Sequence, residues 1–286
     1  MNKTSQQLTN EKLVSSAPEV NHHQRVDEKG LIKSVGLLMR LVSRFGLAAG
    51  FKIFAQVKLE KMDHVRVPGV LHPISLRKAS TDKYAFFQTF LYKEYELDYV
   101  AAPAVIIDGG ANIGMFSVLM KNQFPHAQVI SIEPDAENFR QLKLNTSNYQ
   151  NVFLENMGLW NKDTNLHVYD KYELGNWGMV VEESPSGNIK GGSINMLMRK
   201  YNLKQIDILK LDIESSEKVI FSSNYEYWLS RTRMIIIELH DSLQAGCAQQ
   251  FFEVIQKVFN KYSFAVKGEN VIITNLSWQP DEAPQS

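Results

Sequence analysis

Cysteine is almost absent from this chain: its 286 residues include one, Cys247. A lone cysteine cannot form a disulfide within the chain, and no Cys/His cluster accompanies it to bind zinc. Such sparing use of cysteine is typical of a reducing compartment, so the sequence predicts a cytoplasmic protein.

Net charge and long hydrophobic runs are lacking as well. Lysine and arginine together number 31 and aspartate and glutamate also 31, a balance that gives no indication of nucleic-acid binding. No stretch approaches the ~18 apolar residues of a membrane-spanning helix. The polar first 20 residues lack the apolar centre of a secretory signal. The sequence therefore predicts neither a nucleic-acid partner nor a membrane span.

What is present changes in character along the chain. Polar residues without any apolar period come first, an amphipathic stretch follows, and a long segment then mixes strand-like and helix-like patterns. These changes predict four segments: a disordered tail (1–30), N-terminal amphipathic helices (31–64), a main domain (65–278) and a C-terminal tail (279–286).

The amphipathic stretch is basic. Between Leu31 and Arg66 it carries seven basic and two acidic side chains, a net charge of 7 − 2 = +5. Gly46 and Gly50 are expected to break or kink it before a second short helix at about Phe51–Lys58. These helices either pack on the main domain or lie on an anionic membrane surface as a peripheral contact.

In the main domain, predicted strands alternate with predicted helices. The alternation predicts an α/β domain with a buried parallel sheet, and two closing strands with a short loop predict an antiparallel edge. A hairpin-like excursion is expected at Asn165–Asp170 and Met179–Glu182. The predicted sheet strands are Val105–Asp108, Gln128–Glu133, Asn151–Asn156, Ile206–Glu214, Met234–His240, Ser263–Lys267 and Val271–Thr274.

The first of these strands leads into the stretch VIIDGGANIGMFSVLM, Val105–Met120. An apolar run ends on an acid, a glycine-rich turn follows, and a helical pattern starts at once, as at the binding sites of nucleotide-like cofactors. The dinucleotide fingerprint requires glycine where this turn has Ala111, which disfavours a nicotinamide cofactor. The chain also lacks a Walker motif, which disfavours phosphoryl transfer.

S-adenosyl-L-methionine makes demands that this stretch meets. It has no pyrophosphate, and it needs an acid followed by a glycine turn and a second acid for its ribose. Asp108 ends the first strand and Glu133 the second, 133 − 108 = 25 residues later. Both therefore lie at carboxyl ends of adjacent parallel strands, where open α/β sheets bind ligands. Adenine is expected near the third strand end, which includes Asn156.

Four segments in order, IDGGANIGMFS, ISIEPDAENFRQLKLN, DILKLDIESSE and IIIELH, resemble the FkbM family of S-adenosylmethionine-dependent methyltransferases. The resemblance extends from about Pro73 to Ser277. It implies a Rossmann-like class I methyltransferase fold with seven mostly parallel strands and an antiparallel last strand. It also implies methyl transfer, usually to a hydroxyl of a sugar or natural product. The positions that it carries over as cofactor contacts are Asp108, Gly110, Asn112, Gly114 and Glu133.

The predicted catalytic residues lie at the carboxyl ends of the fourth and fifth strands. Because parallel neighbours end at the same sheet edge, Asp212, Glu214, Glu238 and His240 are expected to form a polar cluster. His240 is the candidate general base because its unperturbed pKa is about 6.5. Asp212 is an alternative base or orients the acceptor, whereas Glu214 either joins the site or caps the next helix. Lys210 is expected to pair with one of these carboxylates.

Three points stay open at this stage. Ser215 stands where family members usually have glycine, which leaves the substrate contact there undecided. The acids and His240 could bind a divalent cation, but their spacing does not demand one, so no metal is assigned. Trp177 could stack on a sugar.

The main functional hypothesis is O-methylation of a glycan or small natural product. A non-catalytic S-adenosylmethionine-binding protein of the same fold is the alternative, and a nicotinamide-dependent oxidoreductase is less favoured.

Overall fold

The computed structural model describes residues 31–170, 179–214 and 216–279. The chain divides into two units, Met1–Leu37 and Leu38–Ser286, and the contacts discussed below lie within the second. The predicted tail at 1–30, Trp177, Ser215 and positions 280–286 of the predicted C-terminal tail lie outside the described residues.

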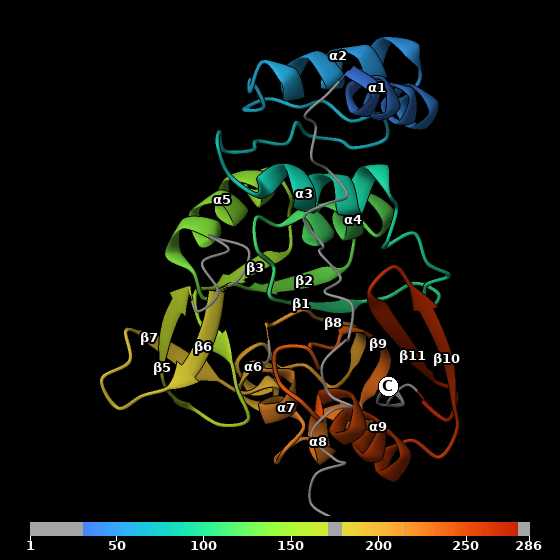
Figure 1. Ribbon diagram of the computed structural model, residues 1–286. Coiled ribbons are helices and arrows are strands. Elements are labelled where there is room, and N and C mark those ends of the chain that lie inside the picture. Colours follow the sequence, from blue (N-terminus) through green and yellow to red (C-terminus); the bar gives the residue numbers. More distant parts are fainter. Residues whose placement is uncertain (1–30, 171–178, 215, 280–286) are drawn as a thin grey trace, which may run out of the picture. The chain divides into compact units, whose positions relative to one another are not determined.

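Helices and strands alternate through most of the chain (Figure 1). In order they are α1 (Leu31–Phe45), α2 (Leu47–Lys58), α3 (Asp82–Phe86), the π-helical turn η2 (Phe87–Leu91), β1 (Val105–Gly109), α4 (Met115–Gln123), β2 (Gln128–Ile132), α5 (Ala136–Thr146), β3 (Val152–Glu155), β4 (Gly158–Leu159), β5 (Thr164–Asp170), β6 (Met179–Glu183), β7 (Ile189–Gly192), α6 (Ile194–Lys200), β8 (Ile206–Leu211), α7 (Glu217–Ile220), α8 (Glu226–Ser230), β9 (Thr232–Glu238), α9 (Cys247–Val258), β10 (Tyr262–Lys267) and β11 (Asn270–Asn275).

The main sheet has seven strands in the order β10-β11-β9-β8-β1-β2-β3. The pairs β1–β2, β2–β3, β1–β8 and β8–β9 are parallel, whereas β11 is antiparallel to β9 and to β10. Every residue of β8 is buried, as expected of a central parallel strand covered on both faces. The predicted fold class, a mostly parallel seven-stranded sheet with an antiparallel last strand, is confirmed.

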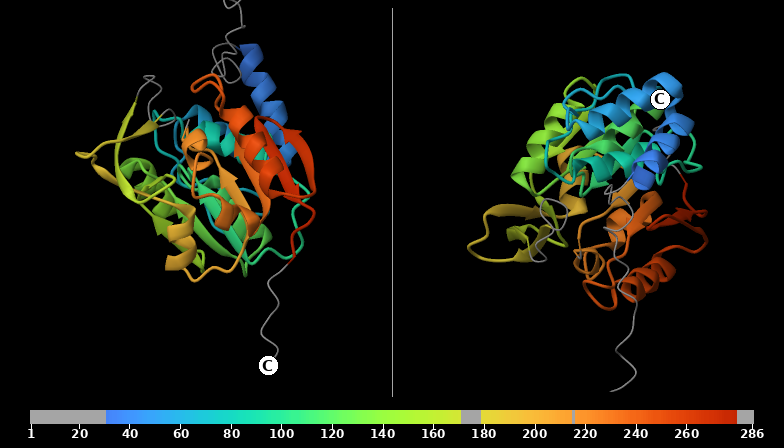
Figure 2. Two further views of the ribbon diagram at one scale, coloured as in Figure 1. Left: turned by 90° about the horizontal axis from the view of Figure 1, so that it is seen from below. Right: turned by 45° about the horizontal axis from the view of Figure 1, so that its top comes forward.

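Hydrophobic cores lie on both faces of this sheet. Alternate residues of each strand point to opposite faces, so Ile106 and Ile208 pack with Phe116 of α4 in one core, and Ile107 and Leu209 lie in the other. Figure 1 shows α4 and α5 on one side of the sheet and α6 to α9 on the other, and Figure 2 gives two further views.

A second, four-stranded sheet has the order β4-β7-β5-β6. Its hairpin β5–β6 confirms the predicted excursion, but β4 and β7 were not predicted. Leu166 of β5 is fully buried and fills space that glycines leave open. A Cβ on Gly158 would lie 2.6 Å from the Leu166 side chain, and one on Gly191 would lie 2.7 Å from it.

Helices α1 and α2 are separated at Gly46, whose φ is 83°, as predicted. The predicted break at Gly50 is wrong: Gly50 lies inside α2, where a Cβ would approach the Cα of Val42 in α1 to 2.6 Å. This glycine therefore permits close helix packing. No helix among the described residues is long and apolar enough to cross a membrane.

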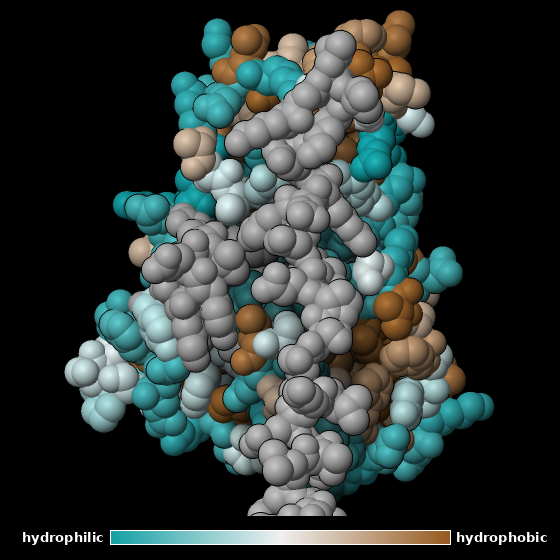
Figure 3. Space-filling view, viewed as in Figure 1, coloured by the Kyte–Doolittle hydropathy of each residue, from teal (hydrophilic) through white to brown (hydrophobic). Residues whose placement is uncertain are grey.

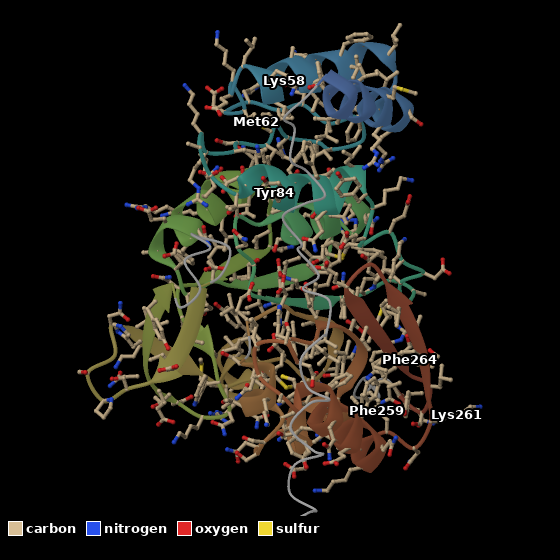
Figure 4. The ribbon with its side chains drawn as sticks, viewed as in Figure 1. Lys58, Met62, Tyr84, Phe259, Lys261 and Phe264 are labelled. Atoms are coloured by element: carbon tan, nitrogen blue, oxygen red, sulfur yellow. The ribbon has the colours of Figure 1, made fainter. Side chains whose placement is uncertain are left out.

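One face of α2 is apolar and exposed. Leu47 is 69% exposed, Phe51 50% and Leu59, directly after the helix, 65%. Hydrophobic side chains gather at the top of the space-filling view, around α2 (Figure 3). Exposed Lys52 and Lys58 belong to the same helix, and Figure 4 marks Lys58. The helix thus combines apolar and basic side chains at its surface.

Candidate active site

The glycine-rich turn after β1 is held in an unusual backbone conformation. Gly110, Asn112 and Gly114 have φ of 70°, 49° and 87°, in the left-handed region that glycine and, less readily, asparagine adopt. A Cβ at Gly110 would lie 1.7 Å from the carbonyl oxygen of Asp212. Only glycine therefore fits at position 110, where the turn passes directly against the chain leaving β8.

Glu133 follows β2 and faces this turn. Its Oε2 accepts a hydrogen bond from the Asn112 N–H at 2.7 Å, and its Oε1 accepts one from the Asp135 N–H at 2.9 Å. Glu133 is only 5% exposed. Burial raises the pKa of Glu133 to about 7, although the two backbone N–H groups act to lower it. Each carboxylate oxygen can accept a further hydrogen bond.

A cavity opens at the carboxyl ends of β1, β2 and β8. Gly110, Asn112 and Glu133 line it on the side of the turn, and Asp212 and Glu214 line it on the side of β8. The fold thus brings three of the predicted cofactor residues and two of the predicted catalytic residues to one cavity.

The other predicted cofactor residues are not among those that line this cavity. Gly114 begins α4, and a Cβ there would approach Leu142 of α5 to 2.7 Å. The Asn156 side chain donates hydrogen bonds to the carbonyls of Glu133, at 2.9 Å, and Pro134, at 3.1 Å. Cofactor contact by these residues and by Asp108 stays a prediction.

Asp108 lies fully buried at the end of β1. It accepts a hydrogen bond from the Ser117 hydroxyl at 2.6 Å, and its Oδ1 lies 3.6 Å from Lys210 Nζ. Burial raises the pKa of Asp108, and the charge of Lys210 opposes that shift. Lys210 also donates to the Gly110 carbonyl at 2.8 Å and lies 3.5 Å from Asp212 Oδ2. The predicted pairing of Lys210 is confirmed, and it ties the turn to the end of β8.

The predicted catalytic residues meet around His240. Its Nε2 lies 3.5 Å from Glu238 Oε1, 3.7 Å from Glu214 Oε2 and 4.0 Å from Asp212 Oδ1. β8 ends at Leu211, three residues before the predicted end, and Glu214 has a φ of 48°. The carboxylate of Glu214 thus lies beside His240.

Sequence reasoning missed Glu217, whose carboxylate contacts Nδ1 of the His240 ring. Its side chain is 1% exposed, and its Oε1 lies 2.9 Å from His240 Nδ1. The same oxygen accepts the Ile213 N–H at 3.1 Å. Glu217 was visible as the last acid of the DIESSE segment, but only the helical start at α7 turns it toward His240.

The carboxylates dominate the electrostatics of the site. Burial lowers the pKa of His240, but the interactions with Glu217 and Glu238 raise it to about 12. Burial and the charge of Asp212 raise the pKa of both Glu214 and Glu238. The carboxylates thus hold the pKa of His240 above the unperturbed value of about 6.5. Its role as general base stays a prediction.

The strand order, with its antiparallel β11, is that of the class I methyltransferases, whose methyl donor is S-adenosyl-L-methionine. The sequence matches the family described as the Methyltransferase FkbM domain over residues 108–265. The chain belongs to this family and is a methyltransferase. The nicotinamide-dependent alternative is thereby not supported.

The chain also matches individual proteins at low sequence identity. The chain is 26% identical over 184 residues to "Methyltransferase 1" of Beauveria bassiana, a match covering 54% of this chain and 74% of the relative. It is 25% identical over 236 residues to "Methyltransferase sdnD" of Sordaria araneosa, covering 68% of this chain and 86% of that protein. A third match, 22% identical over 237 residues, is to the AMB antimetabolite synthetase AmbE of Pseudomonas aeruginosa. It covers 68% of this chain but only 11% of that much longer relative.

Among solved structures, Aeropyrum pernix fibrillarin with natively bound S-adenosyl-L-methionine aligns at a TM-score of 0.36 and 11% identity, covering 67% of this chain and 72% of that one. Precorrin-6y C5,15-methyltransferase from Geobacter metallireducens aligns at a TM-score of 0.36 and 12% identity, covering 67% and 86%. The family assignment rests on the sequence match and the strand order.

The described residues fit S-adenosyl-L-methionine. The buried carboxylate of Glu133 faces the cavity with lone pairs that suit a ribose diol. Gly110 also lines this cavity, and its lack of a side chain lets the turn lie against the Asp212 carbonyl.

Proposed function

We propose that the protein methylates a hydroxyl oxygen of a small-molecule or glycan acceptor. The observation that carries this proposal is the cluster of Asp212, Glu214 and His240 on strand ends beside the cofactor cavity. A hydroxyl must lose its proton as its oxygen is methylated, and this cluster offers groups that accept and hold a proton.

The residues divide between donor and acceptor. S-adenosyl-L-methionine, when bound, supplies an electrophilic methyl group on a sulfonium sulfur. Glu133 would accept hydrogen bonds from the ribose hydroxyls, and the turn at Gly110–Asn112 would hold the amino-acid end. The sulfonium sulfur would release this methyl group to the acceptor oxygen and keep the electrons of the S–CH3 bond. The hydroxyl proton leaves to a carboxylate of the cluster.

Within the cluster, Asp212 and Glu214 line the cavity and are the proposed proton acceptors. His240 lies behind them with Nδ1 fixed by buried Glu217, so its ring is oriented toward the same space. We assign to His240 the placing of these carboxylates and of the acceptor hydroxyl.

Two observations support the proposed class of acceptor. The cavity wall is rich in polar groups from the turn, Glu133, Asp212 and Glu214, which suits a hydroxylated ligand. The match to a region of an antimetabolite synthetase favours a natural product.

The test is methyl transfer to a panel of sugars and hydroxylated natural products, read as S-adenosylhomocysteine formed and as a mass gain of one methyl group. The Asp212→Asn variant, which removes one proposed proton acceptor, is expected to lower turnover by ~10²–10⁴-fold, the range for lost proton-transfer catalysis. Its affinity for S-adenosyl-L-methionine, measured by calorimetry, should stay near that of the parent protein.

Glu253→Ala, which changes an exposed carboxylate on α9, is the matched control. A parent protein that binds S-adenosyl-L-methionine but methylates no acceptor would support the non-catalytic alternative. Methylation exclusively at nitrogen would refute the assignment to oxygen.

A further inference from the structure

Three potential metal ligands from two adjacent strand ends converge in the cluster. A carboxylate oxygen of Asp212, one of Glu238 and an imidazole nitrogen of His240 all lie within 4.8 Å of one another. In octahedral coordination with bonds of ~2.1 Å, neighbouring ligand atoms lie about 3 Å apart and opposite ones about 4.2 Å apart. The observed distances of 3.5 and 4.0 Å from His240 Nε2 to the two carboxylates fall within that range.

The distances are too long for the groups to satisfy one another directly. Charge-assisted hydrogen bonds measure about 2.7–2.9 Å, whereas Nε2 keeps at least 3.5 Å from Asp212, Glu214 and Glu238. The three carboxylates therefore stay beyond charge-assisted hydrogen-bond distance of Nε2, and an ion between them would make the contacts that they do not make with one another.

Glu217 fixes the orientation of the His240 imidazole through the ring nitrogen Nδ1. Nδ1 lies 2.9 Å from Glu217 Oε1, and the Glu217 side chain is 1% exposed. A carboxylate accepts hydrogen bonds, so Nδ1 carries a hydrogen and Nε2 is the atom turned toward the other acids. Metal-bound histidines commonly have such a carboxylate on the second ring nitrogen.

The two oxygens of Asp212 are divided between partners in a similar way. Oδ2 lies 3.5 Å from Lys210, and Oδ1 faces His240. Four acids, Asp212, Glu214, Glu217 and Glu238, lie within 4.0 Å of the His240 ring nitrogens, and Lys210 lies 3.5 Å from one of them, Asp212. A divalent cation would offset the excess negative charge.

A separate observation points to a ligand in the cavity that Asp212 lines. Ser216 is 2% exposed and lines the cavity together with Asp212 and Glu214. Its hydroxyl has no hydrogen-bond partner among the described residues. Buried hydroxyls are normally hydrogen-bonded, so a water or ligand group that accompanies an ion would satisfy it.

The geometry points to a divalent-cation site formed by Asp212, Glu238 and His240, with Glu214 at its edge. Two carboxylate oxygens and one imidazole nitrogen suit a divalent transition-metal cation such as Mn²⁺, and Asp212 is the ligand that also lines the cavity. A cation there lies next to the proposed acceptor position, where it would favour loss of the hydroxyl proton. That catalytic role rests on the proposed function, whereas binding of the ion does not.

Binding is tested with Mn²⁺ alone on the full chain, by electron paramagnetic resonance of the free ion and by calorimetry. One saturable site with Kd below about 1 mM is expected, within the range of oxygen-rich sites. Asp212→Asn and Glu238→Gln should each weaken Mn²⁺ binding more than ~10-fold, and Glu217→Gln should weaken it ~10–100-fold by freeing the ring. Glu253→Gln, on exposed α9, should bind as the parent does.

Affinity for S-adenosyl-L-methionine reports whether each variant is folded. If a variant does not fold, Mn²⁺ should still raise the unfolding temperature of the parent above its value in chelator. No saturable binding below about 1 mM, or equal binding by the parent and both ligand variants, would overturn the inference. An inactive parent that binds Mn²⁺ normally would count against the proposed methylation and leave the site intact.

Discussion

Lys210 is the buried cation on which the turn and the end of β8 both depend, and replacing it with methionine tests that arrangement. Its side chain is 5% exposed, with Nζ 3.6 Å from Asp108 and 3.5 Å from Asp212. At an effective dielectric constant of ~20, each attraction amounts to roughly 4–5 kcal/mol before the desolvation of the ammonium is subtracted. The charges of Asp212 and Asp108 outweigh that desolvation, so the pKa of Lys210 is raised.

Methionine keeps most of the volume but leaves Asp108 buried without a counter-charge and the Gly110 carbonyl without its donor. Breaking a buried pair by removing one partner costs about 3–5 kcal/mol. We therefore expect Lys210→Met to lower the free energy of unfolding by about that amount, measured by urea denaturation with an unchanged m-value.

Lys200→Met is the matched control, because Lys200 pairs with Glu155 but is 50% exposed, and such pairs contribute about 0–1 kcal/mol. A second change, Asp108→Asn in the Lys210→Met protein, removes the stranded charge and should restore part of the loss. Equal costs for the two lysine variants, or a cost below about 1 kcal/mol at Lys210, would refute the reasoning.

Three other predictions concern the cofactor turn and the surface. Burial raises the pKa of Glu133 to about 7, and its carboxylate accepts ribose hydrogen bonds best when ionised, so affinity for S-adenosyl-L-methionine should rise from pH 6 to 8, approaching tenfold per unit below the pKa. Calorimetry on Glu133→Gln should give weaker, pH-independent binding, and parallel pH profiles of the two proteins would contradict this. Gly110→Ala should lower the free energy of unfolding by more than the ~1–2 kcal/mol that a left-handed backbone costs an alanine. Gly69→Ala is the control and should cost only that amount, since Gly69 has a φ of 82° but open space around it. Similar melting temperatures for the two variants would refute the steric argument. If the basic, apolar face of α2 contacts anionic membranes, the protein should sediment with anionic vesicles at low salt and less at high salt. Phe51→Ser should reduce the sedimented fraction, whereas Phe264→Ser, at a similarly exposed position on β10, should not. A parent protein that stays in the supernatant would exclude the contact.

The sheet could be predicted from the sequence because its central strands are continuous apolar runs that end on acids. Asp108 and Glu133 were placed at strand ends by that pattern alone, and both lie there. β4 and β7 could not be predicted, because they are only two and four residues long and contain glycine. Such short segments show no alternation of polar and apolar residues.

The cluster was predicted in composition but not in geometry. β8 stops at Leu211 because the chain at Asp212 must pass Gly110, a crossing between residues about a hundred positions apart. The contact of Glu217 with His240 and the raised pKa of His240 follow from that crossing and from the position of α7. They depend on tertiary contacts, which strand alternation does not describe.

The way Leu166 sits in the small sheet has a consequence for how related sequences can diverge. Gly158 of β4 lines the cofactor cavity. The Leu166 side chain occupies the space that a side chain on Gly158, or on Gly191 of β7, would need. A larger residue at Gly158 or Gly191 would have to be accompanied by a smaller one at Leu166. Mutational drift in this wall of the cavity is therefore expected to proceed through paired, covarying substitutions, and single replacements should be rare among homologues.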